Sequence, residues 1–466
     1  MQSLRISFKH VLVLAILGIA VFLTVFPPQT LSTDQSRTLG IVLVTLSLWA
    51  TGLVPGFMAS LLFFAVTLLL ELAPPAIVFS GFASTAIWLV FSGSILAATV
   101  RNSGLGERLG GVLGRHLTGH YHLLIGGLFI TTAALAFIIP SSLGRFFVML
   151  PIAMALADRA GFSEESNGRT AIALTLTLAA NMPGFAILPS NVPNLVLAGA
   201  SETIYGVAPT YAQYLALHFP VLGLIKGVIA FLLIIRLFPD RITPRPDGES
   251  KNSEESASPL SPRQWYAIAV LLVTLGMWMT DSIHGINAAW VGLCAAIALM
   301  VPGLGVIKPE NFDKTVSLSV LVFTAGILGL GAVINATGLG AAIARGLESV
   351  LPLSPGQDFL NFISLSLMAF LSALVTTLPG VPAVFTPLAG ELSQLTGLSL
   401  TAVLMTQVVG FSTVILPYQA APLMVGLQAT GQPVSRMMRI TVPLALITIV
   451  VLMPLDFLWW KLLGVI

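Results

Sequence analysis

Long apolar segments that contain no acidic or basic side chain make up most of this chain. Several exceed the roughly 20 residues that one helix needs to cross a bilayer, so each must hold two helices or one helix interrupted within the membrane. These charge-free segments are residues 38–70, 72–100, 117–144, 170–201, 282–307, 315–344, 359–390 and 392–435. The pattern predicts an all-α integral membrane protein with about 11 transmembrane helices.

Residues 239–264 interrupt this pattern. They are rich in Pro, Ser and charged side chains, a composition typical of a flexible linker. Basic residues gather here and near the N-terminus, at Arg5 and Lys9, so the positive-inside rule places both regions in the cytoplasm. An apolar run follows Lys9, and we expect it to be a retained first helix rather than a cleaved leader.

The linker separates two similar halves. Residues 89–96 (LVFSGSIL) correspond to 321–328 (LVFTAGIL), and residues 188–196 (LPSNVPNLV) correspond to 416–424 (LPYQAAPLM). Matches that occur in the same order in both halves predict structural repeats. We expect five elements in each repeat, and an odd number of membrane crossings would invert the second repeat relative to the first, as in many secondary transporters. The predicted parts are an N-terminal segment with the first transmembrane helix (1–37), the first inverted repeat (38–238), the cytoplasmic linker (239–264) and the second inverted repeat (265–466).

Composition agrees with a membrane location. Of the 466 residues, 56% are hydrophobic and 9% are charged, against roughly 25% charged in an ordinary soluble domain. No basic run interleaved with aromatic residues is present, so we expect no nucleic-acid partner. Neither a Walker motif nor a nucleophile with an adjacent base is visible, so we expect neither an ATP-driven pump nor an enzyme. The single cysteine, Cys294, excludes a disulfide framework or a cysteine-based metal site.

Four apolar segments contain Pro, Gly and polar residues that would interrupt a helix inside the membrane. They pair under the repeat: residues 138–147 (IIPSSLGRFF) with 376–387 (TTLPGVPAVFTP), and residues 181–194 (NMPGFAILPSNVPN) with 412–422 (STVILPYQAAP). The first pair predicts the tips of two re-entrant hairpins, and the second pair predicts two helices unwound mid-membrane. Alternatively, these residues only kink packed helices. The predicted hairpin arms are residues 122–139 and 146–157 in the first half and 359–375 and 383–392 in the second.

Breaks of this kind can bind both an anion and a cation. The N-termini of half-helices present unpaired N–H groups and a positive dipole end, which suit a carboxylate or sulfate. Freed carbonyls, Ser hydroxyls and Asn amides suit Na⁺, which we expect as a possible coupling ion, with no other cofactor or metal. The substrate-binding candidates are Ser141, Ser142, Gly144, Arg145, Thr376, Thr377, Pro379 and Gly380, and the ion-binding candidates are Ser141, Ser190, Asn191, Asn194, Thr413 and Gln419.

Arg145 is the most informative of these residues. It lies in the first hairpin tip between long charge-free stretches, and a charge within a membrane segment costs a few kcal/mol on insertion scales. One interpretation is a direct guanidinium contact to an anionic substrate. The other is a side chain that extends to the interface from a shallower hairpin.

Two further sets of polar residues have a plainer interpretation. His116, His120 and His122 have partly helical metal-ligand spacing, but the region is typical of an interfacial amphipathic helix. Asp281 and Asp456 lie near the ends of apolar segments, where we expect an interfacial position, with a proton relay as the alternative.

At the breaks the sequence resembles the divalent anion/sodium symporter family, whose members carry sulfate or di- and tricarboxylates. Family hairpin tips carry a Ser-Asn-Thr motif before a proline. Here Ser141, Ser142 and Leu143 stand at the first tip, and Thr377, Leu378 and Pro379 at the second. The unwound helices of the family carry a Gly-Thr-Pro-Pro-Asn-like motif, which residues 190–194 match in part and residues 419–423 match poorly. The resemblance implies two inverted five-element repeats, elevator-like movement and a homodimer.

We therefore predict a secondary active transporter of a small anion, a dicarboxylate or a sulfate-like oxyanion, in the cell inner membrane with a cytoplasmic N-terminus. Cation-coupled symport by an elevator-type mechanism is the first expectation. A sodium-independent exchanger, a proton-coupled carrier or a uniporter on the same scaffold is the alternative, and an anion channel or a membrane sensor is a further one. Because Arg145 has no counterpart in the family motif, we hypothesise that its fixed charge replaces part of what sodium supplies in relatives.

Overall fold

The computed structural model describes residues 8–106, 108, 117, 119–243, 259–348 and 352–466, and these contain helices and connections without any strand. The helices before the linker are α1 (Phe8–Val25), α2 (Thr33–Thr51), α3 (Gly56–Leu69), α4 (Pro75–Val78), α5 (Ser80–Ala83), α6 (Thr85–Asn102), α8 (Tyr121–Ala134), α9 (Ser142–Arg159), α10 (Asn167–Asn181), α11 (Val192–Tyr205), α12 (Tyr211–His218) and α13 (Lys226–Leu237). The all-α expectation is confirmed for these residues.

The second half repeats the same kinds of element. Its helices are α15 (Pro262–Met279), α16 (Asp281–His284), α17 (Ala288–Met300), α18 (Phe312–Thr315), α19 (Leu318–Ala336), α20 (Leu339–Glu348), α21 (Asp358–Thr376), α22 (Gly380–Phe385), α23 (Ala389–Thr396), α24 (Leu400–Phe411), α25 (Ala421–Ala429), α26 (Val434–Ile447) and α27 (Met453–Leu462). Helix pair α8/α9 is followed by α10 and α11, just as α21 with α22 and α23 is followed by α24 and α25.

Each half also ends in a long helix that contains a π-helical segment. In the first half, η4 (Phe219–Ile225) joins α12 to α13, and in the second, η8 (Thr448–Leu452) joins α26 to α27. Pro220 lies within η4 and Pro454 lies just after η8, and proline removes a backbone donor and so disturbs the regular helical ladder. Short π-helical segments of this kind are frequent at functional sites.

Four described helices are long and apolar enough to cross a membrane: Tyr211–Leu237, Leu318–Ala336, Asp358–Thr376 and Val434–Leu462. A fifth candidate combines Gly380–Thr396 with Leu400–Phe411, which are bent by 120° at their junction. The total is smaller than the expected number because several apolar segments are divided into shorter helices, as the breaks in the sequence predict. The number of crossings therefore stays a prediction.

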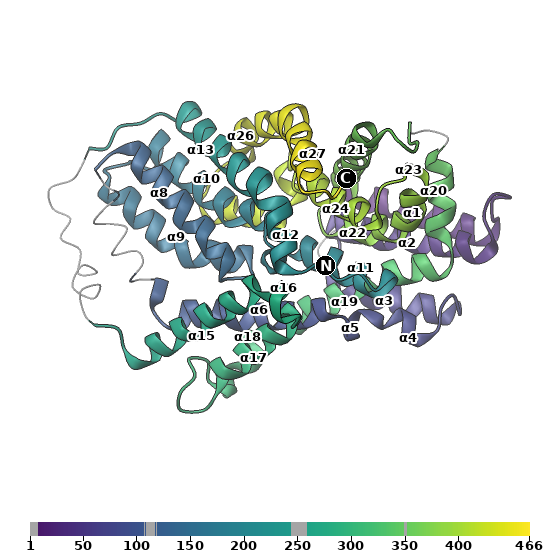
Figure 1. Ribbon diagram of the computed structural model, residues 1–466, viewed down its shortest axis with the longest axis horizontal. Helices are drawn as coiled ribbons and strands as arrows, with labels where there is room; N and C mark the ends of the chain where they lie inside the picture. Colours follow the sequence, from purple (N-terminus) through teal and green to yellow (C-terminus); the bar gives the residue numbers. More distant parts are fainter. Residues whose placement is uncertain (1–7, 107, 109–116, 118, 244–258, 349–351) are drawn as a thin grey trace, which may run out of the picture.

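Small residues allow the helices to pack closely. A Cβ atom added to Gly326 of α19 would come within 2.3 Å of the Ser60 side chain of α3, and one added to Gly329 would come within 2.4 Å of the Val78 carbonyl. Close approach at small residues is the usual way in which membrane helices associate. In Figure 1, α6, α15 and α17 run along one long edge of the molecule, and α8, α9, α10 and α13 gather at one end of the opposite edge.

The two ends of each hairpin meet. In the first, the Tyr121 hydroxyl at the start of α8 donates to the Phe238 carbonyl, and Thr243 N–H donates to the Ala160 carbonyl after α9 (3.0 Å), so both ends lie beside the exit of α13. In the second, the Asn361 amide in α21 donates to the Thr396 carbonyl at the end of α23 (3.1 Å). The two ends of each hairpin therefore lie close together, and entry and exit on one side of the membrane stay a prediction.

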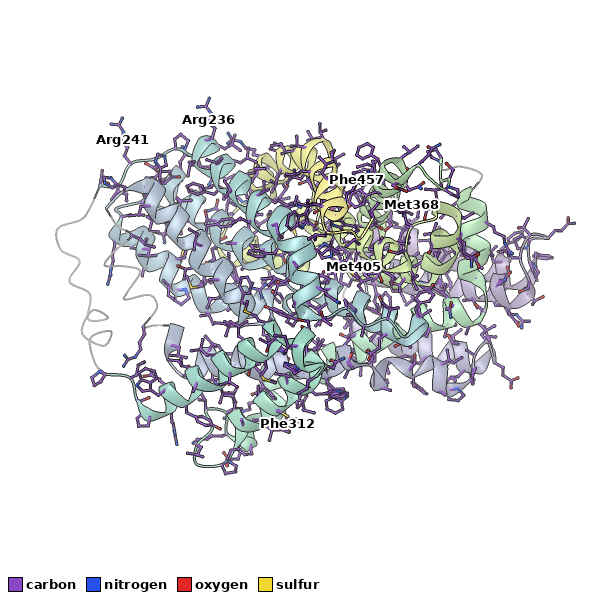
Figure 2. All side chains as sticks on the ribbon, in the orientation of Figure 1. Arg236, Arg241, Phe312, Met368, Met405 and Phe457 are labelled. Atoms are coloured by element: carbon purple, nitrogen blue, oxygen red, sulfur yellow. The ribbon has the colours of Figure 1, made fainter. Side chains whose placement is uncertain are left out.

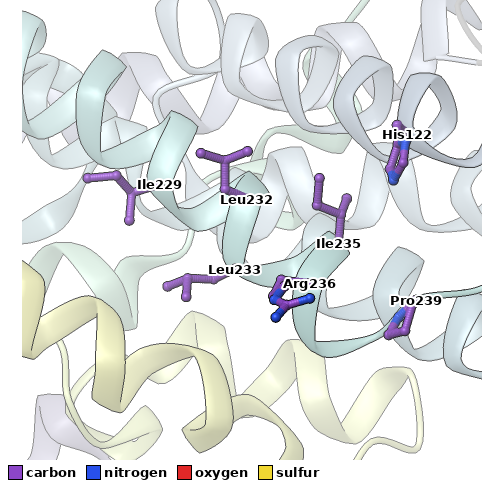
Figure 3. Close-up of a pocket in the computed structure, with 7 residues that line it drawn as sticks. All are labelled: His122, Ile229, Leu232, Leu233, Ile235, Arg236 and Pro239. Atoms are coloured by element: carbon purple, nitrogen blue, oxygen red, sulfur yellow. The ribbon is translucent and has the colours of Figure 1, made fainter.

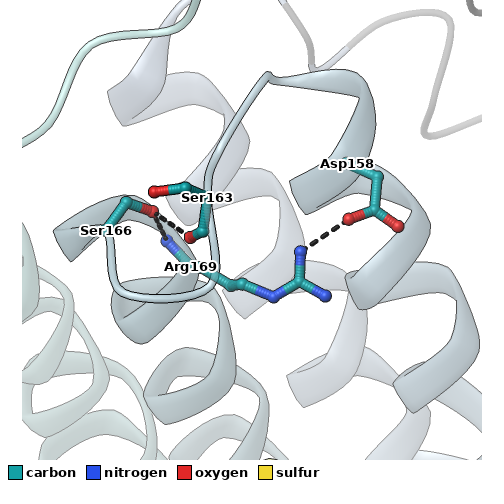
Figure 4. A network of polar contacts seen from close by, with 4 residues as sticks. All are labelled: Asp158, Ser163, Ser166 and Arg169. Atoms are coloured by element: carbon teal, nitrogen blue, oxygen red, sulfur yellow. Dashed lines mark hydrogen bonds and ion pairs between the residues drawn. The ribbon is translucent and has the colours of Figure 1, made fainter.

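Charged side chains mark the outer surface near the first hairpin. Arg236 and Arg241 are exposed and point away from the molecule (Figure 2). Arg169 forms an ion pair with Asp158 (2.5 Å) across the turn from α9 to α10, where Ser166 caps α10 through Arg169 N–H (3.1 Å; Figure 4). The base of this hairpin is therefore polar, whereas its tip is buried at Ser142 and Arg145 and half-buried at Ser141 and Gly144.

Candidate transport site

The tip of the first hairpin is shaped by a proline and a helix cap. Pro140 ends the turn after α8, and Ser141 is the N-cap of α9, accepting a hydrogen bond from Gly144 N–H through its hydroxyl (3.0 Å). A Cβ added to Gly93 of α6 would lie 2.9 Å from Pro140 Cγ. Gly93 therefore lets the tip sit directly against α6.

The first unwound segment separates α10 from α11. Two short 3₁₀ turns, η2 (Pro183–Ala186) and η3 (Leu188–Ser190), replace the helix, because proline at each start cannot continue the α-helical ladder. The Asn194 side-chain amide donates to the carbonyls of Gly184 (2.8 Å) and Ile187 (2.9 Å). Asn194 thereby supplies hydrogen bonds that the interrupted backbone lacks.

Arg145 joins the first tip to the first unwound segment. Its side chain is fully buried, with 0% exposure. Six oxygen atoms accept its N–H groups. They are the carbonyl oxygens of Ile139 (2.5 Å), Ala180 (2.7 Å to Nη2 and 2.9 Å to Nε) and Ser190 (3.3 Å), the hydroxyls of Ser190 (2.8 Å) and Ser142 (3.2 Å), and Asn191 Oδ1 (3.2 Å).

These bonds occupy the whole guanidinium, which has five N–H donors. A buried side chain with all its donors engaged does not extend to the interface, so the interfacial interpretation of Arg145 is wrong for this structure. Nor is a donor left over for a direct bond to an anion. A Cβ added to Gly184 would lie 2.7 Å from Arg145 Nη2, so the absence of a side chain there makes room for the guanidinium.

Four of the predicted residues thus form one network. Ser142 donates to Asn191 Oδ1 (2.5 Å), and Ser142, Ser190 and Asn191 all accept from Arg145. Ser141 caps the helix beside them, and Gly144 packs against Ala97, 3.1 Å from where its Cβ would stand. The ion-binding and substrate-binding candidates of the first half therefore share one location.

The second tip and second unwound segment also touch, through backbone groups. Leu378 N–H donates to the Gln419 carbonyl (3.2 Å). The Gln419 side chain accepts from Ile415 N–H (3.0 Å) and Leu416 N–H (2.8 Å), where the helix is open. Its buried amide nitrogen has no partner among the described residues.

The remaining candidates of the second half line the same region. Thr377 has φ +67°, and a non-glycine residue with such a backbone angle is strained. Thr376 Oγ1 donates to the Ser372 carbonyl (3.0 Å), and Thr413 Oγ1 to the Val409 carbonyl (2.8 Å). Pro379 and Gly380 stand at the start of α22.

The halves interlock around the two tips. Helix α11, which follows the first break, packs against α22 of the second hairpin, while α25, which follows the second break, packs against α9 and α10. At the end of α11 the Tyr205 hydroxyl donates to the Pro387 carbonyl (3.2 Å) and accepts from Gly390 N–H (3.0 Å). Each hairpin is thus attached to the broken helix of the other half, although no hydrogen bond in the described residues joins the two tips directly.

Sequence reasoning missed two residues that the structure places at the breaks. Gly184 lies against Arg145, and Lys226 Nζ donates to the Ser412 carbonyl at the end of α24 (2.7 Å). A lone lysine within the apolar helix Tyr211–Leu237 was a signal that could have indicated Lys226. Nothing local distinguishes Gly184 from other glycines.

The other polar candidates differ in their placement. His116 lies outside the described residues, His120 and His122 are exposed, and no group of three or more His, Cys, Asp or Glu residues in the described ranges could hold a metal. Asp281 is buried and caps α12 through Tyr211 and Ala212 N–H groups. Asp456 is also buried, with 0% exposure, and the interfacial position of both carboxyl groups stays a prediction.

A groove of about 570 Å³ lies on the outer side of α13, close to α8 (Figure 3). Its lining residues are His122, Ile229, Leu232, Leu233, Ile235, Arg236 and Pro239. None belongs to a tip or an unwound segment, and most are aliphatic. The tips and breaks, and not this groove, therefore stay the predicted location of the transport site.

Comparison with known proteins fits this arrangement. Residues 6–466 match the family described as the sodium:sulfate symporter transmembrane region. The chain belongs to this family. The match spans nearly the whole chain and confirms the resemblance seen in the motifs, so the protein is a multi-pass membrane protein of an anion-transporting family.

Members of known name are distant in sequence. The chain is 26% identical to the citrate/succinate antiporter of Escherichia coli over 53% of each protein. It is 22% identical to dicarboxylate transporter 2.2, chloroplastic, of Arabidopsis thaliana over 96% of this chain and 83% of that one. The match thus spans about half the length of the antiporter. The fold resembles the Alcanivorax borkumensis YdaH transporter, with a TM-score of 0.55 and 13% identity over 83% of this chain and 87% of that one.

Proposed function

We propose that this protein is a secondary active transporter of small dicarboxylates that works without sodium at the first break, where Arg145 supplies the positive charge. The observation that carries the proposal is the buried guanidinium held by six oxygens between tip and unwound segment. Dicarboxylates rather than sulfate are proposed because relatives are named for dicarboxylate, malate and citrate/succinate transport.

The positive end of two helices supports an anion site beside Arg145. The N-termini of α9 and α11 meet where Ser142 bonds to Asn191. Both helix dipoles point their positive ends here, and the guanidinium lies directly behind. A carboxylate would bind to the outer side of the tip, where Ser141 and Gly144 are only half-buried. Arg145 would stabilise it through the electric field and not through contact.

Sodium independence follows from the competition for oxygen atoms. Carbonyl and hydroxyl oxygens are the ligands that hard cations such as Na⁺ prefer. The oxygens where tip and break meet already accept hydrogen bonds from Arg145. A second positive charge there would meet electrostatic repulsion from Arg145. Of the Asn and Ser side-chain oxygens named at this break, Asn194 Oδ1 alone has no hydrogen-bond partner among the described residues, and one oxygen is too few to hold Na⁺. This supports the sodium-independent alternative over sodium-coupled symport at this position.

An ion-replacement experiment tests the proposal. Purified protein is reconstituted into liposomes loaded with unlabelled succinate, and counterflow of labelled succinate is measured with Na⁺ or with choline as the external and internal cation. We expect equal rates in the two salts. Loss of counterflow in choline would contradict sodium independence, and absence of succinate counterflow in both salts would contradict the substrate class. Current that does not saturate with succinate would instead indicate a channel.

The interlocked halves support elevator-type movement as the transport mechanism. Because each hairpin is tied to the broken helix of the other half, the tips and breaks would move as one body against the remaining helices. We further propose a homodimer in the cell inner membrane, with the N-terminus and the linker in the cytoplasm. The basic residues around the linker support that orientation.

A further inference from the structure

A buried polar cluster lies where the last helices of the two halves cross. It consists of His218 at the end of α12, Lys226 at the start of α13, and Asp456 and Trp460 on α27. Helix α27 packs against η4, the π-helical segment between His218 and Lys226. The His218 and Trp460 rings lie 5.7 Å apart in an edge-to-face arrangement. Of these residues Lys226 alone contacts a break described above, and His218, Asp456 and Trp460 belong to neither the tips nor the breaks.

The cluster contains ionisable groups with unmet hydrogen-bonding capacity. Asp456 and His218 have 0% exposure, and Lys226 has 3%. Neither carboxylate oxygen of Asp456 and neither ring nitrogen of His218 has a hydrogen-bond partner in the described residues. No ion pair within 4.0 Å joins Asp456 to Lys226 there, although the two groups interact electrostatically. A charged carboxylate without partners is very costly inside a protein, so this arrangement favours the neutral acid.

Lys226 connects the cluster to the second break. Its ammonium donates to the carbonyl of Ser412, the residue that ends α24 (2.7 Å). A cation at this end of a helix is favourable because the dipole is negative there. A cavity of about 10 Å³ lies beside them, lined in part by Lys226, Ser412 and Thr441. This is about the room that one water molecule needs.

We propose that Asp456 is a proton-binding site and that its charge controls whether Lys226 holds the second break closed. With Asp456 neutral, Lys226 stays on the Ser412 carbonyl and caps α24. When Asp456 releases its proton, its carboxylate attracts the ammonium, which leaves Ser412 and frees the end of α24 to rearrange. Transport would then be coupled to H⁺, so the coupling ion of this carrier is a proton. The coupling of the proton to transport rests on the proposed function.

The surroundings contain few other groups that could take this role. From α12, His218 and the Tyr214 hydroxyl face the cluster, and Tyr214 already donates to the Phe185 carbonyl (3.0 Å). From η4 and α13 the charged group is Lys226. The α21 side supplies the rings of Phe359 and Phe362 and, at its first residue, the carboxyl of half-buried Asp358. Trp460 lies one turn beyond Asp456 on the same helix, and Lys461 is exposed.

His218 is the group that would accept the proton released by Asp456. Its two free ring nitrogens can accept a proton on one side and donate on the other, as histidine does in proton shuttles. The proton leaving an Asp456 oxygen would pass to an imidazole nitrogen and then to the aqueous side that is open. The proton count balances, with one proton bound and one released in each cycle.

Infrared spectroscopy tests the proton site without any substrate. Purified protein at neutral pH should show the carbonyl band of a protonated carboxyl, and Asp456→Asn should lose it. Asp158→Asn, the same exchange in the exposed ion pair with Arg169, is the matched control and should keep the band. A band that persists in Asp456→Asn, or that is absent from the unaltered protein, would overturn the proposal. Asp456→Glu keeps a carboxyl on a longer side chain and should shift the band without abolishing it, which covers the case in which Asp456→Asn does not fold.

Liposome assays test the coupling. An inward pH gradient in sodium-free medium should stimulate succinate uptake by the unaltered protein. Asp456→Asn should lose this stimulation while retaining succinate counterflow, because counterflow needs no net proton movement. Equal stimulation in Asp456→Asn would refute the coupling. If the unaltered protein shows no succinate counterflow, the proposed substrate class fails, and the infrared result still decides the proton site.

Discussion

At the scale of single residues, Arg145 predicts how the protein responds to sodium. Arg145→Ala removes the guanidinium donors from six oxygens at the first tip and break. Asn191 Oδ1 keeps its bond from Ser142, and the Ile139 carbonyl keeps its bond from Ser141 N–H. Each buried acceptor that loses its partner costs about 1–3 kcal/mol, so we expect a marked fall in Tm and weaker succinate binding. The vacated oxygens suit Na⁺. NaCl should therefore raise the Tm of Arg145→Ala relative to choline chloride, whereas the Tm of the unaltered protein should be the same in both salts.

The control for that experiment is Arg169→Ala, which removes an arginine that pairs with Asp158 at the surface. Surface ion pairs contribute about 0–1 kcal/mol, so this variant should keep its Tm within about a few degrees and show no response to sodium. A sodium effect of equal size in both variants would reflect salt in general and not a vacated cation site.

A second residue-scale prediction concerns the space around the guanidinium. Gly184→Ala would place a methyl group 2.7 Å from Arg145 Nη2 and 2.8 Å from both Ser190 Oγ and Asn191 Oδ1. Overpacking of this kind costs about 1–3 kcal/mol, so denaturation in detergent should show a lower Tm and transport should fall. Gly276→Ala in α15 has no neighbour within 4 Å and should be neutral or slightly stabilising. Similar effects of both substitutions would contradict a specific requirement at Gly184.

At the scale of elements, some boundaries of the hairpins and breaks could be predicted from sequence and others could not. The second arm of the first hairpin, expected at residues 146–157, begins earlier, at Ser142 of α9, so Arg145 lies in its first turn. The second arm of the second hairpin, expected at residues 383–392, is divided into α22 and α23. The second hairpin's predicted first arm, residues 359–375, coincides with α21 (Asp358–Thr376), and the predicted first break contains η2 and η3. These signals are local, because Pro and Gly change the backbone at their own positions. The partners of Arg145 were not predictable in this way: the Ala180 carbonyl lies 35 residues away, and a carbonyl carries no mark in the sequence.

The tip of the second hairpin predicts a trade between stability and function. Thr377 has φ +67° and ψ 167°, a backbone conformation that costs about 1–3 kcal/mol for a residue with a Cβ. Thr377→Gly should therefore raise Tm, while loss of the hydroxyl at a predicted binding position should weaken succinate transport. Glu71 is the other non-glycine residue with positive φ among those described (53°), and it is exposed and far from the predicted candidates in sequence. Glu71→Gly should raise Tm and leave transport unchanged; a loss of transport in both would argue against a role for the tip.

At the scale of the whole molecule, both breaks hold a buried basic side chain against a backbone carbonyl, but a different element supplies that side chain in each. In each, a buried cation of the protein lies on the carbonyl end of the first half-helix: Arg145 on Ala180 of α10 and Lys226 on Ser412 of α24. Arg145 comes from the adjacent hairpin, whereas Lys226 comes from the last helix of the first half. With all donors engaged, Arg145 is fixed in place. Lys226 has a nearby carboxyl that can compete for it, so the second break is the one that a proton can control.

The predicted inversion of the second half relative to the first can be tested by labelling. The base of the first hairpin, near Glu165, lies beside Thr243 at the start of the linker, and the base of the second lies near Gln357. If the halves are inverted, these bases face opposite sides of the membrane. In a Cys294→Ser background, Glu165→Cys should react with an impermeant thiol reagent only from the cytoplasmic side, and Gln357→Cys only from the other. The Cys294→Ser protein without an added cysteine is the control for background labelling, and reaction of both added cysteines from the same side would refute inversion.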